Sequence, residues 1–132
     1  MATKLSEHFT VEEFQCNHCG KCIVDMRIID LAEKVRAYLG GYAMHVHCGY
    51  RCPAHNAASG GVKNSQHMYG RALDFHIRGM TPWTIYTRLL DGQRRGLLPN
   101  LHGLGVYDWG IHIDCREAPG LAKWDSRTKK DD

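Results

Sequence analysis

The sequence predicts one small domain of the α+β class, in which an antiparallel sheet is flanked by helices. Segments with apolar residues at a helical period lie apart from segments in which apolar and polar residues alternate, as they do along strands. With 132 residues, the chain suits a single modest hydrophobic core. We place the domain at residues 1–120 and a charged tail at residues 121–132.

The first half of the chain contains the signals for two helices. Thr10 precedes the run Val-Glu-Glu-Phe, and Glu13 completes a capping box with it, so a short helical turn is expected after Thr10. Apolar residues then recur at a helical period over residues 25–39. Two glycines at 40 and 41 end this pattern, which makes residues 25–39 the longer helix.

The remaining elements follow from alternation and from breakers. A further helix is expected from Pro82 to about residue 92, with Thr81 as its N-cap. Strands are expected at residues 42–48, 70–77, 103–107 and 111–115, and the last two form a hairpin around residues 108–110. Residues 49–65 form a long loop, and loops of this length in compact domains are usually functional.

Two of these segments carry residues of catalytic type. The run Ser-Gln-His-Met-Tyr-Gly-Arg-Ala-Leu-Asp at residues 65–74 offers His67 and Asp74, and Gly70 allows the turn that folds His67 back toward the strand. In the later run Gly-Ile-His-Ile-Asp, strand alternation puts His112 and Asp114 on one face and two isoleucines on the other, toward a core. Any one of these residues alone would more commonly bond a turn backbone.

Two imidazoles and one carboxylate form a ligand set that suits Zn²⁺. Three protein ligands leave the fourth tetrahedral position to water, which is the arrangement of catalytic rather than structural zinc sites. The two segments together therefore predict a catalytic metal centre at His67, Asp74 and His112.

With these residues the sequence resembles the zinc D-alanyl-D-alanine carboxypeptidase-like metallopeptidases, peptidase family M15, which include D-Ala-D-Ala dipeptidases and phage L-alanyl-D-glutamate endolysins. The shared pattern Ser-x-His-x-x-Gly-x-Ala-x-Asp is met at Ser65, His67, Gly70, Ala72 and Asp74. Further blocks at residues 8–14, 49–56 and 60–61 extend the similarity to residues 6–117. The resemblance implies a fold like that of hedgehog domains and D,D-peptidases, with a zinc site in a cleft on the sheet.

The resemblance also implies residue roles and a function. His67, Asp74 and His112 would bind zinc, and Arg51 would face the substrate or the developing oxyanion. Further substrate contacts are expected from Tyr50, Ser65 and Gln66. The implied reaction is hydrolysis of amide bonds in the stem or cross-link peptides of peptidoglycan, by a carboxypeptidase or an endolysin-type endopeptidase. The alternative is an inactive zinc-containing module that binds cell-wall peptide or a partner on the same scaffold.

The proton acceptor that such hydrolysis needs is less clear from the sequence. In relatives an acid or a histidine stands two or three residues before the last zinc histidine, where this chain has glycine and tryptophan. Asp108 lies one residue farther back, and Asp114 follows His112 by two residues on the same strand face. We favour Asp114 for a role beside the zinc and keep Asp108 as the rival base. Asp114 could instead orient a ligand or Arg116.

Six cysteines indicate a second feature. The run Cys16-x-x-Cys19-x-x-Cys22, with Cys52 or Cys48 as a partner, suggests a structural metal or a disulfide. Only one zinc knuckle is evident in the sequence, and buried thiols in a reducing cytoplasm are the alternative. Catalytic thiol chemistry is disfavoured, because no cysteine has a histidine and an orienting acid at recognisable spacing.

Composition indicates how the protein reaches its substrate. The net charge of +3 is mildly basic and is typical of a solvated surface. No stretch approaches the ~20 apolar residues of a membrane span, and the N-terminus lacks a signal-peptide core. We therefore expect a monomer without nucleic-acid partners or membrane insertion, made in the cytoplasm; with the function that the resemblance implies, it would act on the cell wall after release, as phage lysins do. A muramidase is disfavoured, since paired catalytic glutamates are not evident.

Overall fold

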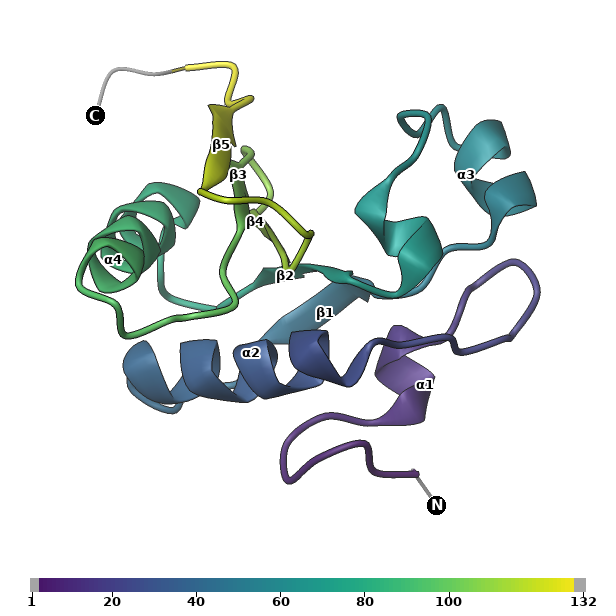
Figure 1. The fold of residues 1–132 in the computed structure, drawn as a ribbon, viewed down its shortest axis with the longest axis horizontal. Coiled ribbons are helices and arrows are strands. Elements are labelled where there is room, and N and C mark those ends of the chain that lie inside the picture. The colour runs from purple at the N-terminus through teal and green to yellow at the C-terminus, as the bar shows by residue number, and fades with distance from the viewer. Residues whose placement is uncertain (1–2, 130–132) are drawn as a thin grey trace.

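A five-stranded sheet in the order β1-β2-β4-β3-β5 forms the centre of the structure, a computed structural model that describes residues 3–129 (Figure 1). Its strands are β1 (His45–Cys48), β2 (Ala72–His76), β3 (Gly103–Val106), β4 (Ile111–Asp114) and β5 (Ala122–Asp125). The neighbouring strands β1, β2, β4 and β3 pair antiparallel in that order, whereas β5 runs parallel to β3. The predicted α+β class and the hairpin of β3 and β4 are confirmed.

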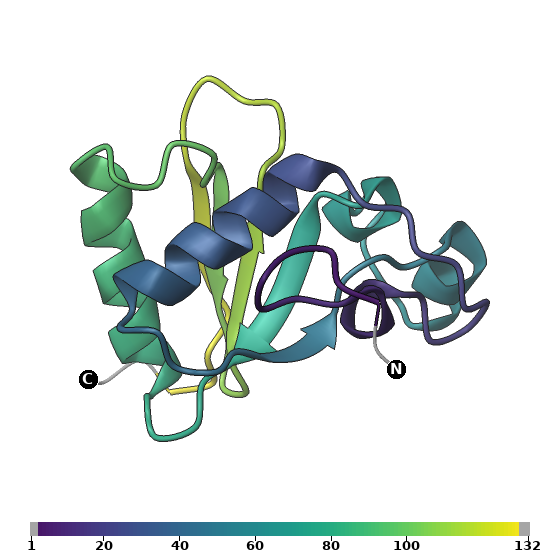
Figure 2. The ribbon, with the colours of Figure 1, turned by 90° about the horizontal axis from the view of Figure 1, so that it is seen from below.

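Helices surround this sheet. They are α1 (Val11–Phe14), α2 (Met26–Tyr38), α3 (Pro53–Ala58), the 3₁₀ helix η1 (Gln66–Tyr69) and α4 (Pro82–Arg94). Figure 2 shows α2 crossing over one face of the sheet, with α4 at one end of the molecule and α3 at the other. Within residues 3–129, no helix combines the length and the apolar character needed to cross a membrane.

Local capping signals fix where the helices begin. Thr10 Oγ1 accepts from the backbone of Glu13, and the Glu13 carboxylate accepts from the Thr10 N–H at 2.9 Å, which completes the predicted capping box. The Asp25 side chain caps α2 through the Arg27 N–H at 2.9 Å. Thr81 caps α4 in the same way. Each such cap contributes about 1 kcal/mol, so these boundaries follow from short-range chemistry.

The register between β2 and β4 separates the core from the polar face. Leu73 pairs with Ile113 and Phe75 pairs with Ile111, and all four side chains are fully buried in the main core beneath α2 and α4. Full burial of such a side chain is worth about 1.5–3 kcal/mol. A shift of one residue would expose all four, so the core sets the register. The intervening residues of β2 and β4 consequently face the opposite side together.

The predicted boundary at residue 120 needs correction. Residues assigned to the charged tail form β5, which pairs with β3 and continues the sheet. Trp124 Nε1 donates to the Tyr107 hydroxyl at 2.7 Å, and the Arg127 guanidinium lies 3.9 Å from the centroid of the Trp83 ring. These contacts join the segment to the domain. The last part of the predicted tail, residues 130–132, lies outside the described residues, as do residues 1–2 of the predicted domain.

A second correction concerns the long loop predicted at residues 49–65. This segment contains α3, with Cys52 as its N-cap and Pro53 in its first turn. Pro fits the first helical turn because its missing N–H has no partner there. The predicted strand at residues 42–48 is likewise shorter, and β1 begins only at His45.

Candidate metal centre

Three elements bring the predicted zinc ligands together. His67 lies on η1, Asp74 on β2 and His112 on β4, and Asp74 pairs directly with His112 across the two strands. Two features fix the turn that carries His67. The Arg51 N–H donates to the His67 carbonyl at 3.1 Å, and Gly70 ends the turn with a backbone φ of 68°. A side chain at Gly70 would collide with the backbone around residue 23, so glycine is required there.

The ligand atoms of the three residues meet at one carboxylate oxygen. Asp74 Oδ1 lies 3.1 Å from His67 Nε2 and 2.9 Å from His112 Nδ1. The two imidazole rings are 5.2 Å apart at an angle of 74°, and both are buried. Two imidazole nitrogens and one carboxylate oxygen are a donor set that fits Zn²⁺, although His112 lies outside the group of ligand atoms that are all within 4.8 Å of one another.

Hydrogen bonds behind the two histidines set their tautomers. His67 Nδ1 donates to the Gly49 carbonyl at 2.7 Å, which leaves the Nε2 lone pair directed at Asp74. His112 Nε2 lies 2.7 Å from Asp114 Oδ2, which leaves Nδ1 directed at the same place. Partners of this kind orient metal-binding imidazoles and raise their basicity.

The electrostatics of the cluster also favour a cation. Burial alone would lower the pKa of His67, but the Asp74 carboxylate and Cys48 outweigh it and raise the pKa to about 10. The pKa of His112 is raised against burial by Asp114 and Asp74. Burial would raise the pKa of Asp74, yet the two histidines hold it well below its usual range. A metal ion binding here would therefore displace protons from the histidines.

Asp114 holds His112 and has no free oxygen. Its side chain is completely buried; Oδ2 lies 2.8 Å from Arg116 Nη2 as well as 2.7 Å from His112. Its Oδ1 accepts from Arg116 Nε at 2.9 Å. Gly103 leaves room for this carboxylate, since a Cβ there would collide with it. Of the two roles considered for Asp114, this geometry supports orientation of a ligand and of Arg116.

Asp108 does not reach the cluster. Its Oδ1 accepts from the Thr128 N–H at 3.0 Å and its Oδ2 accepts from the Thr128 hydroxyl at 2.9 Å. It lines a separate surface pocket beside Trp83. The structure therefore gives no support to Asp108 as the base.

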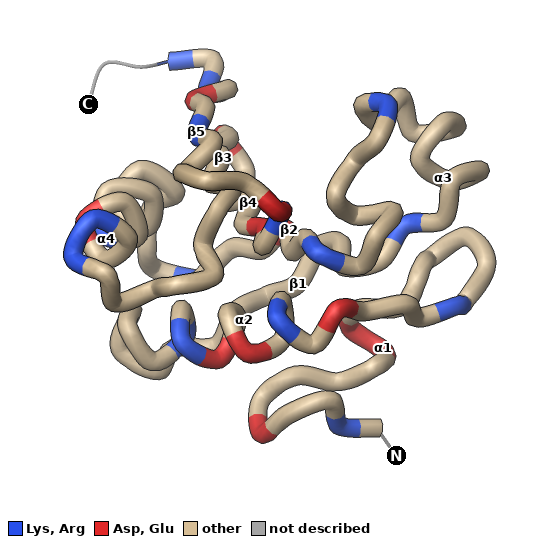
Figure 3. The backbone as a smooth tube through the Cα atoms, in the orientation of Figure 1, with Lys and Arg blue, Asp and Glu red and all other residues tan. Residues whose placement is uncertain are grey.

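A cleft of about 630 Å³ opens above the metal centre. Its lining includes the three candidate ligands, Arg51, Lys63, Ser65, Gln66, Tyr107, Trp109, Arg116 and Trp124. Among the described residues that line it, Asp74 is the one carboxylate. Figure 3 shows basic and no acidic residues on the segment between α3 and β2, whereas α1 carries acidic residues and α2 carries both kinds. The cleft is thus suited to an anionic group such as a peptide carboxylate.

Three of the four predicted substrate contacts lie in this cleft. The Arg51 Nη2 donates to Ser65 Oγ at 3.4 Å, while Arg51 Nε is buried without a hydrogen-bond partner among the described residues. Ser65 also caps η1 by accepting from the His67 N–H, and Gln66 Oε1 is buried and unpaired within residues 3–129. Tyr50 lies elsewhere: it is buried against Cys16 and Cys52.

Cys48 is a neighbour that the sequence did not reveal. Its sulfur and the ligand atoms of His67 and Asp74 all lie within 4.8 Å of one another. The pairing of Cys48 with Asp74 across β1 and β2 causes this approach, and it depends on an irregularity between Val46 and Cys48. In the sequence, the one signal was the alternation of residues 42–48, which placed Cys48 at the end of a strand. Cys48 therefore competes with His112 as the third ligand.

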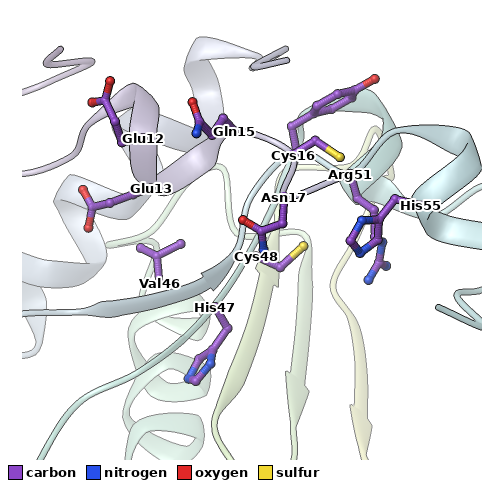
Figure 4. A pocket seen from close by; sticks show the side chains of 11 residues that line it. Glu12, Glu13, Gln15, Cys16, Asn17, Val46, His47, Cys48, Arg51 and His55 are labelled. Carbon is purple, nitrogen blue, oxygen red and sulfur yellow. The ribbon is translucent and has the colours of Figure 1, made fainter. Parts of the chain in front are cut away.

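The predicted cysteine cluster forms in part. The sulfurs of Cys16, Cys19 and Cys52 lie within 4.8 Å of one another, whereas Cys22 packs against the main core. All of the cysteines are free thiols. Figure 4 shows the neighbouring pocket, with Cys16, Arg51 and His55 on one side and Glu12 and Glu13 on the other.

Comparison with known families shows a match over most of the chain. The sequence model of a family described as Peptidase M15 matches residues 7–114. That span contains the three candidate ligands, Arg51 and Asp114. No curated protein matches the chain.

Proposed function

This chain belongs to the peptidase M15 family, and we propose that it hydrolyses amide bonds in the peptide part of peptidoglycan. The family expected from the sequence motif is thereby confirmed. Members of the family are in general zinc-dependent peptidases, so a peptidase function follows from membership. The substrate, and the choice between a carboxypeptidase and an endolysin-type endopeptidase, are the proposal.

The observation that carries the proposal is the convergence of His67, Asp74 and His112 on the floor of an open, positively charged cleft. These three residues would hold the zinc. When bound, the ion supplies Lewis acidity, which polarises a carbonyl and makes water a better nucleophile. The protein side chains provide the orientation that this chemistry needs.

The chain's own residues have distinct parts in that orientation. Asp114 keeps the proton of His112 on Nε2, which frees Nδ1 for the metal. Arg51 lines the cleft and offers a buried Nε that lacks a partner in the described structure. A guanidinium at this place can bind a substrate carboxylate or a developing oxyanion.

The charge of the cleft supports a peptide with a free carboxylate. Arg51 and Lys63 line it beside the single lining carboxylate of Asp74, and Arg116, which also lines it, is paired with the buried Asp114. Aromatic side chains of Tyr107, Trp109 and Trp124 form an apolar wall beside these cations. Stem peptides of peptidoglycan combine short side chains with carboxylate ends, which suits both parts of the cleft.

Digestion of purified peptidoglycan tests the proposal. The zinc-loaded protein is incubated with intact wall, and the released fragments are identified by mass spectrometry. Loss of terminal D-alanine identifies a carboxypeptidase, and cleaved stems or cross-links identify an endopeptidase. His67→Ala protein serves as the control, because it retains the cleft but lacks one ligand. If the zinc-loaded protein leaves the wall unchanged, peptidoglycan is rejected as the substrate.

A second candidate function has its own observation. Neither Asp108 nor Asp114 is placed as a proton acceptor, and the described residues lining the cleft include no carboxylate other than Asp74. That arrangement favours an inactive module that binds wall peptide. Binding of soluble wall fragments to the zinc-loaded protein, with no cleavage after long incubation, would establish the binding function in place of the peptidase.

A further inference from the structure

A second group of metal-binding side chains lies away from the zinc cleft. The sulfurs of Cys16, Cys19 and Cys52 come within 4.8 Å of one another. Cys16 and Cys19 lie in the loop that follows α1, and Cys52 is the N-cap of α3. Three thiols from two segments at this separation match the spacing of sulfurs around a single ion better than that of a disulfide, which would use two and leave one over.

The sequence around these cysteines forms two knuckles. The first is Cys16-Asn-His-Cys19. The second is Cys52-Pro-Ala-His55. This knuckle is less evident in the sequence than a Cys-x-x-Cys pair, because its fourth position is histidine rather than cysteine. Pairs of ligands spaced in this way, one pair from each of two segments, are the arrangement of structural zinc sites with three cysteines and one histidine.

Backbone amides already point at the sulfurs. The Cys16 sulfur accepts from the N–H groups of His18 and Cys52, and the Cys52 sulfur accepts from the N–H of His55, each at 3.4 Å. Such bonds stabilise thiolates, which are the metal-binding form of cysteine.

We propose that Cys16, Cys19, Cys52 and His55 bind a structural zinc ion. His55 follows Cys52 by one helical turn and lines the same pocket as Cys16. The ring of His18 packs edge-on against the His55 ring, 5.7 Å away, and His18 is exposed. In this proposal His55 supplies the fourth ligand, and the His18 ring lies beside it.

The ion would stabilise a part of the molecule with little core of its own. The local apolar cluster consists of Cys16, Tyr50 and Cys52, and α3 has only six residues. Helices this short are not stable by themselves. A metal that joins the loop after α1 to α3 replaces the missing core. The ion would also fix Arg51, which precedes Cys52 in the chain. The Arg51 N–H donates to the His67 carbonyl.

Metal counting separates this site from the zinc cleft. The full chain is purified with reductant and its zinc content is measured by native mass spectrometry. We expect two zinc ions in the parent protein and one in Cys16→Ser, Cys19→Ser or Cys52→Ser. Cys22→Ser is the matched control, since Cys22 shares the loop but packs against the main core, and it should keep two. His67→Ala should keep the cysteine-bound ion.

Cobalt provides an independent readout. His67→Ala protein loaded with Co²⁺ should show a near-ultraviolet thiolate-to-cobalt charge-transfer band, and additional Cys19→Ser should remove it. Cys19 is exposed, so this variant tests the site even if Cys16→Ser does not fold. His55→Ala should alter the cobalt spectrum and lower the melting temperature, and His18→Ala should do neither.

Other outcomes would overturn the inference. A reduced parent protein whose zinc content is unchanged by all three cysteine variants has no such site. A purified chain lighter by two hydrogens, with no cysteine-bound metal after reduction, has a disulfide instead. Loss of the ion in His18→Ala but not in His55→Ala would refute the assignment of the fourth ligand.

Discussion

Asp114 Oδ2 lies 2.7 Å from His112 Nε2, with the Asp114 side chain completely buried. This contact turns the other nitrogen of the ring toward Asp74, where its Nδ1 comes within 2.9 Å of the carboxylate. Arg116 occupies the remaining positions on Asp114. The pair therefore aims one candidate zinc ligand, and Asp114 would act on a bound metal through His112.

The Asp114→Asn variant should lose zinc affinity while keeping some activity. An amide cannot hold the imidazole as the carboxylate does, so the zinc dissociation constant should rise by about 10- to 100-fold, and excess zinc should restore turnover. Asp108→Asn is the comparison, and it should change neither, because Asp108 contacts Thr128. Zinc titration and hydrolysis assays decide this. An Asp114→Asn protein with full zinc and no turnover would make Asp114 the base.

His67→Ala and His112→Ala should each abolish zinc binding in the cleft and all hydrolysis. Cys48→Ser tests the competing ligand, since the Cys48 sulfur lies beside His67 and Asp74. If His112 is the third ligand, Cys48→Ser should keep the zinc of the cleft. Zinc content by native mass spectrometry checks each variant. A cleft that keeps its zinc in His112→Ala and loses it in Cys48→Ser would place Cys48 in the ligand set.

Arg51→Ala should slow hydrolysis strongly while zinc is retained. A guanidinium that stabilises the transition state contributes about 2–4 kcal/mol, which corresponds to about 30- to 1,000-fold in rate. A surface cation contributes about 0–1 kcal/mol. Arg78→Ala is the matched control, because Arg78 is exposed and does not line the cleft. Equal rates for the two variants would remove Arg51 from the mechanism.

Gly70→Ala should destabilise the fold more than an equally strained glycine elsewhere. Gly96 has a similar positive φ of 73°, but a Cβ there meets no atom within 4 Å. Gly96→Ala should therefore cost about 1 kcal/mol, the strain of the left-handed conformation. Gly70→Ala adds a collision with the backbone near residue 23 and should cost about 1–3 kcal/mol more. Urea unfolding measures both, and equal losses would contradict the collision.

Asp25→Asn should remove a pH-dependent part of the stability. Hydrogen bonds from Arg27 lower the pKa of Asp25 from 3.8 to about 2. A carboxyl with a depressed folded pKa stabilises the fold above its unfolded pKa, and this contribution is lost as the pH falls through the folded value. Because the pair is partly exposed, the contribution should be about 0.5–1 kcal/mol.

The measurement for Asp25 is urea unfolding of the parent and the variant from pH 7 down to pH 2. Asn keeps the cap of α2, so the difference between the two proteins reports the charge alone. The difference should be constant above about pH 4 and shrink toward pH 2. A difference that grows as the pH falls would show that Asp25 does not have a lowered pKa.

Short-range chemistry let the sequence by itself determine much of this protein. The caps at Thr10 and Thr81 act within three residues, so their helices could be located without the rest of the chain. The alternation around His112 placed two isoleucines in the core and fixed which face carries the candidate ligand. The family followed from the pattern at residues 65–74.

Only the tertiary structure decided features that depend on pairing between distant segments. β5 pairs parallel with β3, so residues 122–125 belong to the sheet, although the sequence placed them in a charged tail. Register brings Cys48 beside Asp74, and the path of α3 brings Cys52 to Cys16. The two acids near His112 could not be separated by spacing, because the direction of the turn after β3 sends Asp108 to Thr128 and leaves Asp114 buried behind the ring.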